Sequence, residues 1–155
     1  MIHDLLLFAH VIGACVLLGT GAGIAFFMVV SQRSQNPDLI AHVAGIVVLA
    51  DWVFTATAAI AQPITGYFLA LAAGWPLTSG WVAGALGLYV VVGVFWLPVV
   101  WIQKQLCSLA RAAAAQSTPL SPRYHHLYRI WFACGFPAFA AVLAILWLMI
   151  SKPAI

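Results

Sequence analysis

A few polar residues lie inside otherwise apolar stretches of this 155-residue chain, and they are the places where chemistry could occur. They are His10, Asp51, Thr55, Thr57, Gln62, Thr65 and Tyr89. Ionisable side chains inside a membrane are costly and are functional candidates by default. A neutral imidazole facing the interior of a helix bundle is a natural axial ligand for haem iron. His10 is therefore the candidate metal ligand for haem b, with Gln62, Thr65 and Tyr89 around the same pocket; the alternative is a histidine hydrogen-bonded across helices.

The depth of the other histidines restricts this haem hypothesis. His3 precedes His10 by two helical turns on the same side of the membrane, whereas His42, His125 and His126 fall on the opposite side. His10 thus has no histidine partner at its own level. A haem on His10 would be five-coordinate, or would take a ligand that is not a histidine or comes from a second subunit. This argues against a standard bis-histidine electron-transfer cytochrome.

Asp51 is the second candidate, and it forms a polar group with Trp52 and Arg129. Both Asp51 and Arg129 are expected towards the cytoplasmic side, so the two could form a structural salt bridge. The alternative is that Asp51 is a proton or substrate site, since an acidic group within a span is often part of a proton or ion path.

The composition identifies the class of protein that holds these residues. Hydrophobic residues make up 65% of the chain, the mean hydropathy is +1.09 and charged residues make up 6%. Soluble domains carry roughly 25% charged residues. The composition excludes a water-soluble enzyme, a disordered chain and a secreted disulfide scaffold, and it indicates an integral membrane protein in a lipid bilayer.

The spacing of charges predicts an all-α bundle of four transmembrane helices in a single domain, residues 1–155. A span needs about 20 apolar residues, and the charge-free stretches place spans near 5–30, 40–71, 81–105 and 127–150. Residues 74–80 contain Gly and Pro and predict the turn between the second and third spans. The second span is longer than a bilayer core, so it either protrudes into the cytoplasm or breaks near Gln62 and Pro63. Glycines four apart, Gly19 with Gly23 and Gly80 with Gly84, predict close helix packing.

The basic residues predict the orientation. Arg33 lies in the first loop, and Lys104, Arg111, Arg123 and Arg129 lie in or beside the third, whereas the second loop has none. By the positive-inside rule the first and third loops are cytoplasmic and both termini are outside. Lys152 is the one exception.

Several segments resemble a known family. They are LLLFAHVIGACVLLGTGAGIAFF, ADWVFTATAAIAQPITG, WLPVVWIQKQL and the terminal MISKP. Together they resemble the domain-of-unknown-function 2269 family of small bacterial integral membrane proteins, over essentially the whole chain. The resemblance implies a multi-pass protein of the bacterial cytoplasmic (inner) membrane but no particular reaction. It also implies these motif positions: His10, Asp51, Trp52, Gln62, Pro63, Gly66, Trp96, Pro98, Arg129 and Trp131. More distantly, a histidine early in the first span followed by glycines is similar to haem-carrying membrane protoporphyrinogen oxidases and copper-resistance D-type membrane domains.

Three functions remain open at this point. The first is a haem-associated membrane protein, redox-active or haem-handling, with His10 as ligand. The second is a non-catalytic partner subunit or assembly factor of a larger membrane complex. The third is a small transporter or metal-handling protein that uses Asp51 and the kink at Pro63, and four helices would need to form a homo-oligomer to enclose a pathway. The basic pI near 9.0 reflects only three net charges and does not indicate nucleic-acid binding.

Overall fold

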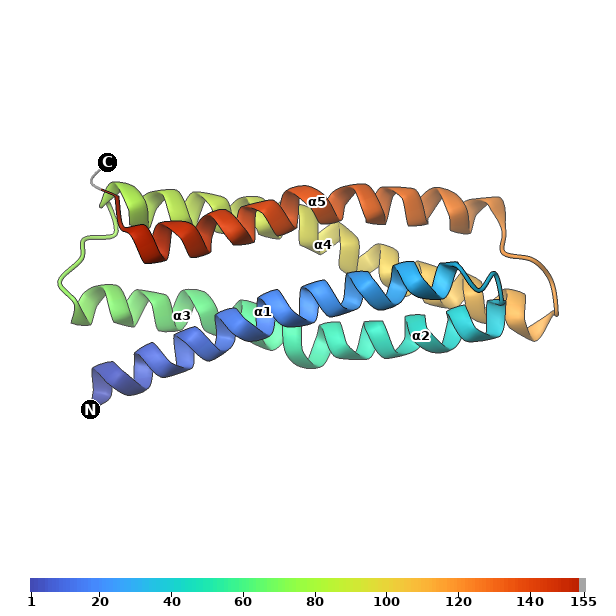
Figure 1. Ribbon diagram of the computed structural model, residues 1–155, viewed down its shortest axis with the longest axis horizontal. Helices are drawn as coiled ribbons and strands as arrows, with labels where there is room; N and C mark the ends of the chain where they lie inside the picture. The colour runs from blue at the N-terminus through green and yellow to red at the C-terminus, as the bar shows by residue number, and fades with distance from the viewer. Residues whose placement is uncertain (154–155) are drawn as a thin grey trace.

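Four long helices, joined by short loops, make up the computed structural model, which describes residues 1–153 (Figure 1). In chain order the elements are α1 (Ile2–Gln32), α2 (Pro37–Ala50), the π-helical turn η1 (Asp51–Thr55), α3 (Ala56–Ala72), α4 (Gly80–Ala115) and α5 (Pro122–Ser151). The elements α2, η1 and α3 form one continuous helix from Pro37 to Ala72. All four helices are long and apolar enough to cross a membrane, which confirms the predicted all-α, four-span architecture. Each predicted span lies within one of them.

Local sequence explains where these helices begin and end. Asn36 precedes α2, and its side-chain oxygen accepts hydrogen bonds from the backbone N–H groups of Asp38 and Leu39, at 2.9 and 3.4 Å. Ser121 accepts in the same way from the backbone N–H of Tyr124 at the start of α5. The turn after α3 contains Gly74 with a φ of +71°, a left-handed conformation that glycine adopts without strain.

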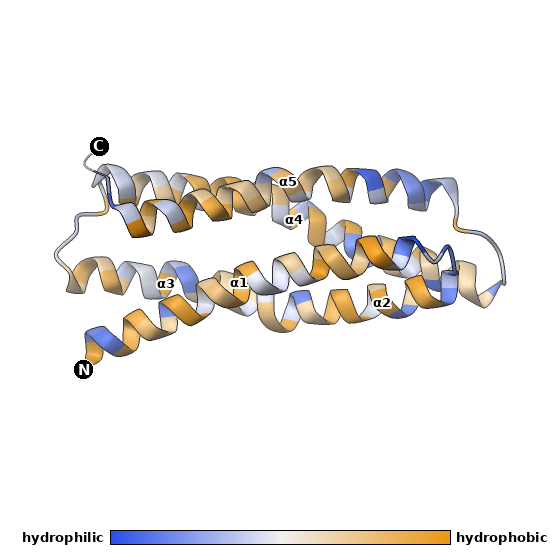
Figure 2. Ribbon diagram, in the orientation of Figure 1, coloured by the Kyte–Doolittle hydropathy of each residue, from blue (hydrophilic) through white to orange (hydrophobic). Residues whose placement is uncertain are grey.

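The two ends of the bundle differ in character (Figures 1 and 2). One end carries the N-terminus, the C-terminal end of α5 and the α3–α4 loop, and we call it the terminal end. The other end carries the α1–α2 and α4–α5 loops, with hydrophilic residues gathered there in Figure 2. We call it the basic end, because most of the cationic residues belong to it: Arg33, Lys104, Arg111, Arg123 and Arg129.

The half of the bundle towards the basic end holds a continuous apolar core. Met28 of α1, Ile40 of α2, Leu106 of α4 and Tyr124 of α5 are fully buried there. The side-chain amide of Gln32 donates a hydrogen bond to the Tyr124 hydroxyl, which joins the end of α1 to the start of α5. All four helices therefore contribute to the packing of this half.

The half towards the terminal end is organised as two helix pairs. There α1 packs along α3 and α4 packs along α5, whereas α3 and α4 have few contacts with each other. Large apolar side chains such as Leu86, Val90 and Phe136 are exposed on the helix surfaces, as expected where lipid is the solvent.

Two predictions about the helices were wrong in detail. The predicted break near Gln62 and Pro63 is wrong, because the second helix stays α-helical through Pro63 and its irregular turn is η1, at Asp51–Thr55. The alternative, that this long helix protrudes into the cytoplasm, stays a prediction. Gly19 and Gly23 face open space, with no atom of another helix within 4 Å of the position a side chain would take. Gly84 does meet a neighbouring helix, since Leu148 lies 3.4 Å from that position.

Candidate functional site

His10 lies half-buried between α1 and α3, with one ring nitrogen already engaged. Its Nδ1 is 2.8 Å from the Thr65 hydroxyl oxygen. That hydroxyl donates its only proton to the backbone carbonyl of Ala61, at 2.8 Å, one turn earlier in α3. With that proton on the Ala61 carbonyl, the Thr65 oxygen accepts from His10 Nδ1–H, which in a neutral imidazole is the tautomer with a lone pair on Nε2. This assignment leaves the lone pair of Nε2 available to a ligand.

Two glycines allow the polar side chains of α1 and α3 to interlock. The Gln62 amide nitrogen donates to the His10 backbone carbonyl at 2.8 Å and occupies the space where a side chain on Gly13 would begin. Conversely, the His10 ring lies on Gly66, whose added Cβ would be 3.1 Å from the ring carbon Cε1. Each helix thus presents a glycine to the polar side chain of the other. The predicted grouping of His10, Gln62 and Thr65 is a real contact set, which we call the His10 cluster together with Gly13 and Gly66.

Tyr89, predicted to lie around the same pocket, is on α4, and its hydroxyl forms a hydrogen bond with α3 and none with His10. Its hydroxyl donates to the backbone carbonyl of Ala59 in α3. Ala59 lies four residues before Pro63, and proline has no N–H with which to complete that helical hydrogen bond. Tyr89 therefore satisfies the carbonyl that Pro63 leaves free, and it provides a polar link between α3 and α4.

A second polar cluster surrounds Asp51 at η1, where the helix passes through its π-helical turn. Asp51 and Gln103 are each only 3% exposed. Trp96 Nε1 donates to Asp51 Oδ1 at 3.3 Å. In the amide orientation that satisfies both of its neighbours, Gln103 donates to Asp51 Oδ2 at 3.1 Å and accepts from Trp131 Nε1 at 3.3 Å. This Asp51 cluster connects the second helix to α4 and, through Gln103, to α5.

The predicted salt bridge between Asp51 and Arg129 does not form. Arg129 is exposed, and the one ion pair among residues 1–153 joins the N-terminal amine to Asp4 at 2.9 Å. Trp52 does not belong to the Asp51 cluster. Its side chain is exposed, and Lys104 Nζ lies 4.7 Å from the centre of its ring. Asp51 is thus a buried acid with neutral partners, in a turn type that occurs frequently at functional sites.

The two clusters lie at different depths. Eleven residues separate Asp51 from Gln62 along the second helix, which is about 16 Å at 1.5 Å per residue. Within the described residues, no three histidine, cysteine or acidic side chains come together as a metal site. Metal chemistry at His10 would therefore need a prosthetic group that brings its own ligands.

Sequence reasoning missed several members of these clusters. Gln103 is not among the polar residues predicted to act, because it lies beside Lys104 at the end of the predicted span 81–105. Its signal is nevertheless visible, since Gln103 follows Trp96 by seven residues, or two helical turns, and so shares its helix face. Gly13 carries no comparable signal, because any helical glycine can oppose another helix.

Comparison with known proteins agrees with the membrane architecture. The model of a family described as "Predicted integral membrane protein (DUF2269)" matches residues 4–153. No curated protein and no solved structure matches the chain.

Proposed function

The chain belongs to this family of integral membrane proteins, and from that premise we propose that it is a haem-associated protein with His10 as axial ligand. We also propose that it lies in the bacterial cytoplasmic (inner) membrane, which its resemblance to a family of small bacterial membrane proteins implies. The protein would either transfer electrons or hold haem for another protein.

The observation that carries the proposal is the hydrogen bond between His10 Nδ1 and Thr65. A histidine that binds a metal through one nitrogen typically donates its other N–H to an oxygen, which fixes the tautomer and orients the ring. Thr65 supplies that oxygen, and Ala61 fixes the direction of the Thr65 hydroxyl proton. The lone pair on Nε2 is the electron pair that haem iron requires.

The surroundings of His10 are also compatible with a planar apolar group. Haem needs one protein nitrogen and an apolar environment, and it supplies the other four iron ligands itself. The terminal half offers helix pairs with few mutual contacts and many exposed apolar side chains. Haem would supply one-electron or ligand-binding chemistry, while Thr65 orients His10 and Gln62 holds α3 against α1.

The direct test is haem content and rescue. The protein would be purified in mild detergent from haem-sufficient cells, and its haem-to-protein ratio and absorption spectrum would be measured with and without dithionite. We expect a stoichiometric Soret band that shifts on reduction, is lost in His10→Gly and returns when imidazole is added. His3→Gly, on an exposed residue two turns earlier, is the matched control and should keep the band. A colourless, folded, monodisperse protein would overturn the proposal and favour a partner subunit of a larger complex.

A second candidate function rests on Asp51. Its carboxyl is buried within the second helix, has only neutral partners and lies at a π-helical turn. A carboxylate without a counter-charge is costly when it is buried in the protein, so the group is suited to bind and release a proton or a small cation. This would be the site of a small transporter or metal-handling protein that assembles as a homo-oligomer.

Infrared difference spectra of the reconstituted protein would test this second function. A carboxyl C=O band that changes with pH, shifts in D2O and is absent in Asp51→Asn would support proton exchange at Asp51. A proton-dependent flux through vesicles that Asp51→Asn abolishes would identify transport. Unchanged spectra and fluxes in the variant would leave Asp51 as a packing residue.

A further inference from the structure

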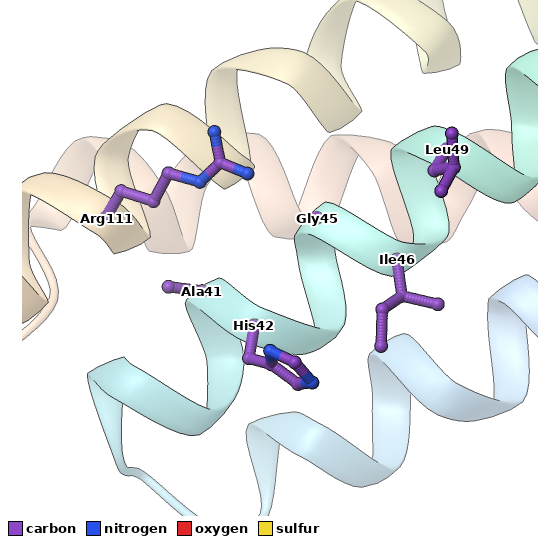
Figure 3. Close-up of a pocket in the computed structure, with 6 residues that line it drawn as sticks. All are labelled: Ala41, His42, Gly45, Ile46, Leu49 and Arg111. Atoms are coloured by element: carbon purple, nitrogen blue, oxygen red, sulfur yellow. The ribbon is translucent and has the colours of Figure 1, made fainter.

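A groove between α2 and α4 at the basic end has no role in either cluster. It has a volume of about 250 Å³ and lies between Gly45 and Val48 on α2 and Lys104, Cys107, Ser108 and Arg111 on α4. A second hollow of about 390 Å³ adjoins it and shares Gly45 and Arg111. Figure 3 shows the Arg111 side chain running along α4 with its guanidinium group between α4 and α2, while His42, which also lines the second hollow, points to another side of α2.

The groove presents hydrogen-bond donors without acceptors. Lys104, Ser108 and Arg111 are spaced four and three residues apart, so they lie along one face of α4. All three are exposed, and none of their side chains forms an ion pair or hydrogen bond with a described residue. Gly45 leaves the space that the guanidinium uses, because a Cβ there would be 3.0 Å from Arg111 Nη2.

The position of the groove along the helix is that of lipid headgroups. Residues 81–101 of α4 are uncharged and cover about 30 Å, the thickness of a bilayer core. Lys104 is the first charged residue beyond them, and Arg111 follows two turns later. Ile46 and Leu49, which line the adjoining hollow, are exposed apolar side chains further along α2 towards the membrane centre.

We propose that this groove binds the phosphate of an anionic phospholipid. Arg111 and Lys104 provide the charge, and Ser108 provides a neutral donor between them. Guanidinium groups recognise phosphate through paired hydrogen bonds, and basic grooves between helices at the cytoplasmic side bind anionic headgroups. The acyl chains lie along Ile46 and Leu49. Charge complementarity selects this occupant, since two cations and a hydroxyl line the groove and none of the described residues that line it is acidic.

The test compares how strongly an anionic and a zwitterionic lipid bind to the purified full chain. Binding of phosphatidylglycerol and of phosphatidylcholine with the same acyl chains would be measured by native mass spectrometry, with thermal unfolding as a second readout. We expect the wild-type protein to prefer the anionic lipid and Arg111→Gln to weaken that preference about fivefold, the effect of one cation at a membrane surface. Arg123→Gln removes the same charge from an exposed position outside the groove and should leave the preference unchanged.

One further variant and one further ligand test the same groove. Gly45→Ala keeps every charge but crowds Arg111, and it should also reduce the preference for the anionic lipid. Inorganic phosphate at equal concentration should give no comparable stabilisation, because it lacks the acyl chains. Equal losses in Arg111→Gln and Arg123→Gln would show that only the overall charge of this end matters. Stabilisation by inorganic phosphate alone would identify a soluble anion. Either result would overturn the proposal.

Discussion

The two halves of the bundle differ in how their helices are held together. Towards the basic end, residues from all four helices form one buried apolar core, with Met28, Ile40 and Leu106 at its centre. Towards the terminal end, α1–α3 and α4–α5 are separate pairs, and the α1–α3 pair is held by the hydrogen bonds of His10, Gln62 and Thr65. Packing among four helices holds one half, whereas in the other half one pair is joined by polar contacts and the other pair, α4–α5, by buried side chains such as Val82 and Ala85.

This difference indicates where the fold is stabilised and where a cofactor or partner can be accommodated. In lipid, burying an apolar side chain gains little from the hydrophobic effect, because lipid tails are as apolar as the core. Stability therefore comes from close packing in the basic half. The terminal half makes fewer packing contacts between its helix pairs, so its arrangement can adapt to a bound group at lower cost.

The largest expected effect of a substitution is in the basic half. Leu106→Ala should lower the free energy of unfolding by about 2 kcal/mol, because it opens a cavity where no lipid can enter. Leu86→Ala, the same change on an exposed position of α4 in the terminal half, should cost less than about 0.5 kcal/mol. Unfolding in mixed micelles measures both. Equal costs would contradict the proposed difference between the halves.

The next effect concerns the Asp51 cluster, which lies between the two halves. Asp51→Leu should destabilise the protein by roughly 1.5 kcal/mol, because Trp96 and Gln103 would lose a buried partner. Asp51→Asn keeps an acceptor for Trp96 and should cost less than half as much. Thermal unfolding in detergent compares the two variants; equal losses in Asp51→Asn and Asp51→Leu would show that an acceptor alone is not enough and that the carboxylate itself is needed.

A smaller effect is expected at the link between the helix pairs. Tyr89→Phe removes the donor to the Ala59 carbonyl and should cost about 1 kcal/mol. Pro63→Ala restores a backbone N–H for that carbonyl, so Tyr89→Phe should be nearly neutral in the Pro63→Ala background. A double-mutant cycle measures this coupling. Additive effects of the two substitutions would show that Tyr89 does not compensate for Pro63.

The smallest effect is expected at Gly13. Gly13→Ala places a methyl group where the Gln62 amide lies, but that amide is the end of a flexible side chain and can move. The cost should be the hydrogen bond to the His10 carbonyl, about 0.6 kcal/mol in a membrane protein. Unfolding of Gly13→Ala and of Gly13→Ala with Gln62→Leu would check this, and a cost well above 1 kcal/mol would mean that the backbones of α1 and α3 also separate.

The sequence was sufficient for the architecture and for part of each cluster. Charge spacing located all four spans, because a bilayer imposes a minimum apolar length. Polarity selected His10, Gln62 and Thr65 as candidates around one pocket, but how the second helix sits against the first could not be predicted, so their contacts come from the structure. The π-helical turn at Asp51 did not, because no local residue requires it and its stability depends on contacts with Trp96 and Gln103 from another helix. The partner of Tyr89 could have been found from Pro63, which leaves one carbonyl free at a known position.

The central claim is that the terminal half, through His10, holds a haem. The most direct measurement is the reduced-minus-oxidised absorption spectrum of the purified protein beside its His10→Ala and His42→Ala variants, which remove one histidine from each half. We predict that His10→Ala loses the haem signal and that His42→Ala retains it at wild-type stoichiometry. A signal that survives His10→Ala but disappears in His42→Ala would place the haem in the basic half and contradict the account.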